Sequence, residues 1–385
     1  MTTEKGTPAQ PGPPMTSDVS EERLEDTLAL CLSGGGYRAM LFHLGTVWYL
    51  NDAGYLPKLD RVSSVSGGSI TAGVLATRWA SLVFDDTGRS TNFADKVVTP
   101  LRKLAGTTID AGSILAGVLL PGTVNDRIID HYRKALFGDQ TLQAFPDRPR
   151  FVINATNVQT GSLFRFSKPY NADWRIGRIL APETPVAAAV AASSAFPPVL
   201  SPARLEFEHD DWRDLNADEC GRPPFTTKVV LTDGGVYDNM GIETAWKRCK
   251  RVLVSDAGAK YQPDDDPHAD WARHSLRINA TIDNQVRSLR KRQIVDAFQS
   301  AADAHVGAYW GMWTKPSDYP VHALPIDDQR ALELAKVPTR LGDLHDVVQE
   351  RIINLGYGMA ERAIRSYYDQ GASAPARFPY PEEGV

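Results

Sequence analysis

Short, unbroken apolar runs alternate along the chain with stretches whose apolar residues recur at helical spacing. Residues 28–32 form the first run, which is typical of a buried parallel strand. Helical spacing follows over residues 37–53, where Gly54 is placed to cap the end of the helix. The same order returns in the strand-like residues 61–65 and in the small-residue helix expected over 70–79. Two strand–loop–helix units in succession predict an α/β fold with a parallel sheet covered by helices.

The later elements follow in a less regular order. We expect further strands at residues 151–156, 162–166, 228–232 and 251–255, and helices at 184–195 and 343–368. From about residue 271 onward the pattern is mostly helical. Because no repeat and no linker divides the chain, we expect a single domain over residues 23–385, with its motifs in 28–258 and helical elaborations in 259–370. Residues 1–22, rich in proline, threonine, glycine and glutamate, are expected to form a disordered tail.

Composition narrows the class of protein. The 385 residues are 42% hydrophobic and 23% charged, as in an ordinary globular protein. The 42 lysines and arginines and the 47 aspartates and glutamates leave a net charge of −5, which argues against a dedicated nucleic-acid binder. The 3 cysteines contain no C-x-x-C pair, so we expect neither a disulfide framework nor a cysteine-based zinc site, and a reducing compartment fits.

No segment has the length and apolar character of a membrane-spanning helix, which needs about 20 apolar residues. The first residues also lack the apolar core of a secretory signal. We therefore expect a cytoplasmic protein. Peripheral contact with a membrane and the oligomeric state are left open.

Three glycine-containing loops carry the candidate chemistry, and the first is Ser64-Val65-Ser66-Gly67-Gly68. A nucleophile elbow has the form G-x-S-x-G, because its serine lies on a strained turn that needs small neighbours. Here Ser64 replaces the first glycine, and it is small enough to satisfy the same steric requirement. The alternative is an ordinary serine-rich turn that caps the next helix.

The second loop is Ser33-Gly34-Gly35-Gly36-Tyr37-Arg38, between a strand and a helix. Consecutive glycines at a helix N-terminus leave N–H groups free to bind an anion or the oxyanion of an acyl-transfer intermediate. Arg38 adds a positive charge at the same corner. The loop does not fit G-x-x-x-x-G-K-[ST] or G-x-G-x-x-G, so a nucleotide-phosphate loop is disfavoured. A tight turn that needs positive φ is the structural alternative.

The third loop is Asp233-Gly234-Gly235, directly after the strand expected over 228–232. A strand that ends in a carboxylate delivers it to the edge of the sheet, where the active sites of α/β proteins lie. Such a carboxylate can act as the general base for a serine. Taken alone, this sequence and the nearby Asp238-Asn239 pair are ordinary turn signals.

Together, and in this order along the chain, the three loops resemble the motifs of the patatin-like phospholipase family. Residues 33–40 are also similar to the arginine-containing glycine loop of cytosolic phospholipase A2 enzymes. The resemblance covers about residues 28–258. Residues 192–197 (ASSAFP) and 236–241 (VYDNMG) look like further segments of the family.

The resemblance implies a three-layer α/β/α fold with a mainly parallel central sheet. It implies a Ser–Asp dyad without histidine, with Ser66 as the nucleophile and Asp233 as the base. The residues expected at the oxyanion and the substrate are Gly34, Gly35, Gly36, Arg38 and Gly67. The implied reaction is hydrolysis of an acyl ester in a phospholipid or related lipid through an acyl-Ser66 intermediate, with no metal or other cofactor.

The residues themselves leave other functions open. A histidine triad has the chain order Ser…Asp…His, and the histidines that follow Asp233 are His268, His274, His305, His322 and His345. None of them follows a convincing strand, so we expect surface or packing roles for them, and His43 is not expected to be catalytic. The same dyad would serve a soluble-ester hydrolase or an acyltransferase, because water and an acceptor alcohol compete for one acyl-enzyme. A catalytically silent lipid- or partner-binding module is the alternative from another class, and the intact dyad and glycine loop favour an enzyme over it.

Three other segments have an ordinary interpretation beside a functional one. The basic residues 287–292 suit a solvent-facing helix surface or contact with anionic lipid headgroups. The apolar residues 112–122 suit a core segment or a mobile cap that meets the bilayer. The acidic residues 264–266 lack the spacing of a calcium loop and are expected to be solvated.

Overall fold

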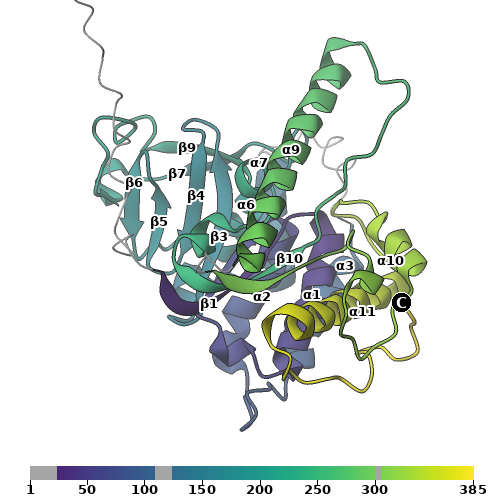
Figure 1. The fold of residues 1–385 in the computed structure, drawn as a ribbon. Coiled ribbons are helices and arrows are strands. Elements are labelled where there is room, and N and C mark those ends of the chain that lie inside the picture. The colour runs from purple at the N-terminus through teal and green to yellow at the C-terminus, as the bar shows by residue number, and fades with distance from the viewer. Residues whose placement is uncertain (1–23, 109–123, 301–304) are drawn as a thin grey trace, which may run out of the picture.

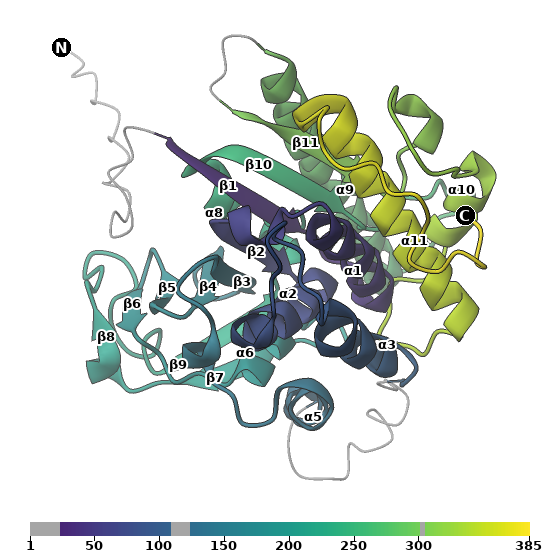
Figure 2. The same ribbon diagram turned by 90° about the horizontal axis from the view of Figure 1, so that it is seen from below.

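The computed structural model describes residues 24–108, 124–300 and 305–385, and in these segments 11 strands form one sheet. The strands are β1 (Glu25–Leu32), β2 (Arg61–Val65), β3 (Arg150–Asn157), β4 (Ser162–Ser167), β5 (Tyr170–Asp173), β6 (Gly177–Leu180), β7 (Ala203–Glu206), β8 (Trp212–Arg213), β9 (Lys228–Asp233), β10 (Cys249–Asp256) and β11 (Val306–Gly311). Their order across the sheet is β11-β10-β1-β2-β3-β4-β5-β6-β8, while β9 pairs with both β3 and β7 (Figures 1 and 2).

The central part of the sheet is parallel. The pairs β11–β10, β10–β1, β1–β2 and β2–β3 are all parallel, and every pair beyond β3 is antiparallel. In register, Leu30 of β1 lies between Leu253 and Val62. Neighbouring residues of β1 are also buried on opposite faces of the sheet, Leu30 in one core and Cys31 in the other, which explains why β1 appears in the sequence as an unbroken apolar run.

Helices cover both faces of this sheet. They are α1 (Gly36–Asp52), α2 (Gly67–Arg78), α3 (Thr99–Ala105), α5 (Val124–Tyr132), α6 (Val186–Ser193), α7 (Gly235–Asp238), α8 (Glu243–Trp246), α9 (Trp271–Gln299), α10 (Asp328–Ala335) and α11 (Asp346–Ala363). Alternate side chains of β1 enter two different cores: Leu30 packs with α1, α2 and α11, whereas Cys31 packs with α8 and with Ile294 of α9. The predicted three-layer α/β/α fold is therefore confirmed.

The C-terminal part differs from the sequence-based expectation in one element. We expected it to be mostly helical, and α9 and α11 confirm this, but β11 adds a parallel strand beside β10. Its two glycines hide the strand in the sequence. At Gly307 a side chain has no room, because a Cβ atom would lie 1.8 Å from the carbonyl oxygen of Val252. Glycine here permits a close approach of two strands and does not mark a turn.

The predicted tail, residues 1–22, and the apolar residues 112–122 lie outside the described residues. Within the part that the structure describes, no helix is both long enough and apolar enough to cross a membrane.

Candidate active site

Ser66 lies at the sharp turn between β2 and α2. Its backbone has φ +50° and ψ −120°, a conformation that L-residues other than glycine rarely adopt. The next residue must be glycine, because a Cβ atom at Gly67 would lie 2.1 Å from the carbonyl oxygen of Gly36. Gly68 is restricted in the same way by the carbonyl oxygen of Leu32, at 2.5 Å. The elbow therefore packs directly against the glycine loop and presents a strained serine at the start of α2.

Replacing Ser66 with glycine is expected to raise the free energy of unfolding by about 1 kcal/mol. Glycine removes a backbone strain of about 1–3 kcal/mol, part of which is offset by the larger entropy of the unfolded chain. Ser66→Ala is the matched control, because it also lacks the hydroxyl but keeps the strain. Urea unfolding of the three proteins measures the difference. A Ser66→Gly protein no more stable than Ser66→Ala would show that the turn is not strained.

Asp233 lies near Ser66 because β3 pairs with both β2 and β9. Val65, just before the serine, pairs with Asn154 of β3, and the next residue of β3, Ala155, pairs with Asp233. The expected delivery of the carboxylate by a strand is thus found, although β9 runs antiparallel to its neighbour β3. The backbone N–H of Asp233 donates to the carbonyl oxygen of Ala195 at 3.0 Å.

The carboxyl group of Asp233 is almost fully buried, at 2% exposure. Its Oδ1 atom accepts a hydrogen bond from the Gly235 N–H at 2.7 Å, whereas Oδ2 has no hydrogen-bond partner among the described residues. Burial raises the pKa of Asp233 to about 6. The Gly235 N–H opposes this rise, as does the Ser66 hydroxyl, which lies near the carboxyl group without a hydrogen bond to Oδ2, and the charge of Asp283 adds to it. The carboxylate is therefore ionised but basic at neutral pH, as a general base should be.

Ser193, at the end of α6, ties the two reactive loops together. Its hydroxyl accepts the N–H of Ser66 at 3.0 Å and donates to the carbonyl oxygen of Asn154 at 2.6 Å. Its own carbonyl oxygen accepts the N–H of Gly234 at 3.2 Å. Residues 192–197 resemble a segment of the family, but their sequence alone indicates no role for Ser193. The pattern of small residues before a proline pair was the available signal.

The glycine loop lies on the other side of Ser66. A Cβ atom at Gly34 would lie 3.2 Å from that of Ser66, so the two backbones are in contact. The N–H of Gly34 is already used, since it donates to the carbonyl oxygen of Asn239 at 2.9 Å. The N–H groups of Gly35 and Gly36 have no acceptor in the part of the chain that is described, and α1 begins at Gly36. These two donors lie at the positive end of a helix beside the serine, an arrangement that can bind an anion.

The guanidinium of Arg38 is not directed at the N–H groups of Gly35 and Gly36. Its guanidinium donates to the carbonyl oxygens of Ala335, of Val337 at 2.9 Å and of Ala257 at 2.8 Å. Burial lowers the pKa of Arg38 to about 10, so it remains charged at neutral pH. Ala257 in turn backs the glycine loop, because its carbonyl oxygen would lie 2.7 Å from a Cβ atom at Gly35. In this structure the Arg38 guanidinium is held by carbonyl oxygens that surround the glycine loop. Its expected role at the substrate stays a prediction.

The histidines weighed as triad members lie elsewhere. Four of those that follow Asp233 in the chain are exposed: His268, His274, His322 and His345. His305 stacks on the ring of Trp246 with a centroid separation of 3.8 Å. His43 is fully buried and contacts the carbonyl oxygen of Ser33 and the hydroxyl of Ser255, each at 2.9 Å. Burial lowers the pKa of His43 to about 4, so a neutral imidazole supports the start of the glycine loop.

No group of three or more His, Cys, Asp or Glu side chains that could hold a metal ion occurs among the described residues. The groups gathered at the site are one serine, one buried carboxylate and backbone N–H groups. Such a set can activate an alcohol nucleophile and stabilise an oxyanion.

Comparison with known proteins places this geometry in context. The family model described as patatin-like phospholipase matches residues 30–246. No curated protein matches the chain.

Among solved structures, human GIVD cytosolic phospholipase A2 is similar with 13% sequence identity and a TM-score of 0.51, over 88% of this chain and 61% of that one. The same human enzyme in complex with methyl gamma-linolenyl fluorophosphonate matches with 14% identity and a TM-score of 0.48, over 87% and 57%. VipD from Legionella pneumophila matches with 17% identity and a TM-score of 0.37, over 90% and 67%. This chain thus spans 61% of the length of the first of these structures, and the likeness to it is one of fold.

Proposed function

Because this chain belongs to the patatin-like phospholipase family, we propose that it hydrolyses acyl esters of phospholipids or related lipids, with Ser66 as nucleophile and Asp233 as general base. The observation that carries the proposal is the juxtaposition of a strained serine with a buried carboxylate whose Oδ2 atom makes no hydrogen bond within the described residues. The free N–H groups of Gly35 and Gly36 lie beside the same serine.

The acylation step uses each of these groups once. Asp233 Oδ2 accepts the hydroxyl proton of Ser66 while Ser66 Oγ forms a bond to the ester carbonyl carbon. The carbonyl oxygen becomes an oxyanion, which the N–H groups of Gly35 and Gly36 stabilise. When the carbon–oxygen bond to the leaving alcohol breaks, that alcohol takes the proton from Asp233 and leaves acyl-Ser66.

Deacylation repeats these steps with water. Asp233 accepts a proton from the attacking water, the second oxyanion forms at the same position, and Ser66 Oγ leaves with the proton as the fatty acid is released. An acceptor alcohol in place of water would give an acyltransferase, and a small ester in place of the lipid would give a soluble-ester hydrolase. The silent binding module is disfavoured because it has no need for a strained serine or for a buried carboxylate.

Gly34 and Arg38 have a supporting role in this proposal. The Gly34 N–H is committed to Asn239, and the Arg38 guanidinium is committed to three carbonyl oxygens. Gly67, by contrast, permits the close approach of the elbow to the glycine loop.

Covalent trapping of the nucleophile tests the proposal. A fluorophosphonate with a long alkyl chain reacts with activated serines, so peptide mass spectrometry of the treated protein should find the adduct on Ser66, and Ser66→Ala should remain unlabelled. Fatty-acid release should then be measured on phospholipid vesicles and on a short soluble ester. Labelling of another serine would exclude this dyad. Cleavage of the short ester alone would leave the dyad in place and exclude the phospholipid substrate.

The pH dependence of hydrolysis should report the pKa of Asp233. Protonated Asp233 cannot accept the serine proton, so kcat/KM should fall tenfold per pH unit below about pH 6 and be constant above it. The charge of Asp283 raises this pKa, so Asp283→Asn should move the midpoint to lower pH. Asp296→Asn, which removes a carboxylate from the same helix, is the matched control. A profile that is flat from pH 4.5 to 8 would show that Asp233 is not the base.

A further inference from the structure

Helix α9 extends away from the body of the protein. It has 29 residues, and its N-terminal half reaches beyond the sheet and the other helices (Figure 1). Ile294 and Ala297, near its C-terminal end, are the buried residues of this helix. About six turns of helix therefore have no buried side chain, which is unusual for an element that carries apolar residues.

Five of the six large exposed apolar residues of α9 form one stripe. Trp271 is 85% exposed, and the other members are Ile278, Ile282, Val286 and Leu289. At about 100° per residue, these five side chains lie within about 80° of the helix circumference. We call this set the α9 stripe.

The α9 stripe faces away from the body, because the opposite side of the helix carries the contacts to it. Arg277 lies over the ring of Tyr261, with its guanidinium carbon 4.2 Å from the ring centroid. Lys291 lies over Tyr309, with its ammonium nitrogen 4.6 Å from the centroid. An apolar stripe with basic residues on the remaining faces is the pattern of helices that lie in a membrane interface.

The charge of α9 differs in sign from that of the chain. The helix contains six basic residues, Arg273, Arg277, Arg287, Arg290, Lys291 and Arg292, and two acidic ones, Asp283 and Asp296. Its net charge of +4 contrasts with −5 for the whole protein. Such a helix complements an anionic bilayer, whereas the rest of the protein is repelled by it.

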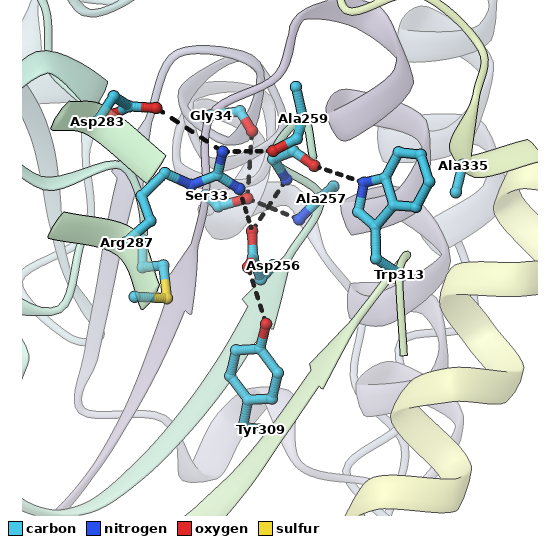
Figure 3. A network of polar contacts seen from close by, with 12 residues as sticks. Ser33, Gly34, Asp256, Ala257, Ala259, Asp283, Arg287, Tyr309, Trp313 and Ala335 are labelled. Carbon is cyan, nitrogen blue, oxygen red and sulfur yellow. Dashed lines mark hydrogen bonds and ion pairs between the residues drawn. The ribbon is translucent and has the colours of Figure 1, made fainter. Parts of the chain in front are cut away.

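Helix α9 is also connected to the candidate active site. Arg287 reaches from the helix to Asp256, at the end of β10, with a nitrogen–oxygen distance of 3.8 Å, and to the carbonyl oxygen of Ala259 (Figure 3). The same Asp256 accepts the hydroxyl of Tyr309 at 2.8 Å. Through its charge, Asp283 of this helix raises the pKa of Asp233.

Two exposed apolar side chains lie next to the reactive carboxylate in the sequence. Phe196 is 63% exposed and follows Ala195, whose carbonyl oxygen binds the Asp233 N–H. Val236, three residues after Asp233, is 54% exposed. A bilayer that contacts these two side chains would bring its acyl esters close to the reactive carboxylate.

We propose that α9 is a membrane-docking element, whose stripe inserts into the interface of an anionic phospholipid bilayer and holds the active site against its substrate. The purpose that we assign to docking, delivery of lipid to the active site, rests on the proposed function. The binding of α9 to a bilayer does not. A second copy of this chain is a less suitable occupant. Ser275 and Gln293 fall within the angular range of the stripe, where the seam of a coiled coil requires apolar residues.

Vesicle flotation of the catalytically silenced Ser66→Ala protein tests the inference without any dependence on hydrolysis. Vesicles of phosphatidylcholine with and without about one third phosphatidylglycerol provide the two surfaces. The stripe variant adds Ile278→Gln, Ile282→Gln and Leu289→Gln. The control variant instead adds Val83→Gln, Leu180→Gln and Leu276→Gln, which are equally exposed but lie off the stripe, Leu276 on another face of the same helix. Circular dichroism and thermal unfolding establish that each variant is folded.

The expected result is binding to the anionic vesicles, with a partition coefficient about tenfold or more lower for the stripe variant and unchanged for the control variant. Equal binding by the stripe and control variants would overturn the inference, as would the absence of binding to anionic vesicles. Equal binding to both kinds of vesicle would overturn its electrostatic part. If sedimentation instead showed a dimer that only the stripe variant loses, the stripe would be an interface between copies. Failure of the proposed hydrolysis would appear separately, in the labelling of Ser66.

Discussion

Replacing Asp233 with asparagine is expected to lower kcat/KM for ester hydrolysis by about 10⁴-fold and, at the same time, to stabilise the protein. The amide occupies the volume of the carboxyl group but cannot accept the proton of Ser66, and loss of a base-supporting carboxylate in serine hydrolases has an effect of about this size. Stability moves in the opposite direction because burial raises the pKa of Asp233 from 3.8 to about 6. The folded protein therefore binds this proton more tightly than the unfolded chain.

The sign of the stability change follows from this difference in proton binding. As the pH rises from about 4 to about 6, the unfolded chain ionises first, and the folded protein loses up to about 3 kcal/mol of stability, at 1.36 kcal/mol per pKa unit. Above pH 6 the whole penalty is present. Asparagine carries no charge at any pH and avoids it.

Urea unfolding of the wild type and of Asp233→Asn at pH 4.5 and pH 8 measures the effect. The stability advantage of the variant should be larger at pH 8. Asp296→Asn, which removes a carboxylate at an exposed position, is the matched control. An equal difference at both pH values would show that the pKa of Asp233 is not raised, and retention of full activity by Asp233→Asn would exclude it as the base.

The sequence predicts the three strands and loops of this site correctly, because a local pattern of residues determines each of them. The apolar run before Ser33, the run before Ser66 and the run before Asp233 all form strands, and each ends at its expected loop. Periodicity and glycine placement suffice for this, because they reflect backbone geometry within a few residues. The helix that follows each of the first two loops is confirmed for the same reason.

The parts that sequence does not predict depend on partners far away in the chain. Arg38 contacts Ala335 and Val337, about 300 residues later, so its charge at the corner of the glycine loop could not reveal where the side chain points. The same is true of the N–H of Gly34, which is taken by the carbonyl oxygen of Asn239. Only the tertiary structure distinguishes the glycines with free N–H groups from the one whose donor is used.

A substitution that moves the whole glycine loop tests its role without first deciding which of its N–H groups is free. Gly67→Ala is expected to lower kcat by about 10²- to 10³-fold, with a much smaller change in KM. The new Cβ atom would lie 2.1 Å from the carbonyl oxygen of Gly36. Because backbone cannot yield as a flexible side chain does, the glycine loop must move away from Ser66. The expected fall in kcat is about that caused by removal of one oxyanion donor. KM changes less, because such a donor stabilises the transition state and not the bound substrate.

Gly106→Ala provides the matched control, because the nearest atom to its Cβ lies 3.7 Å away and its φ is negative. It should retain the activity of the wild type. Steady-state kinetics on one ester, with thermal unfolding to establish that both variants are folded, separates the two outcomes. A folded Gly67→Ala protein with kcat within threefold of the wild type would show that contact between elbow and loop is not needed. The oxyanion would then have to be bound by groups other than Gly35 and Gly36. A selective loss of kcat would instead show that the chemical step requires the close contact between the backbones of Gly67 and Gly36. That contact is possible because residue 67 has no Cβ atom.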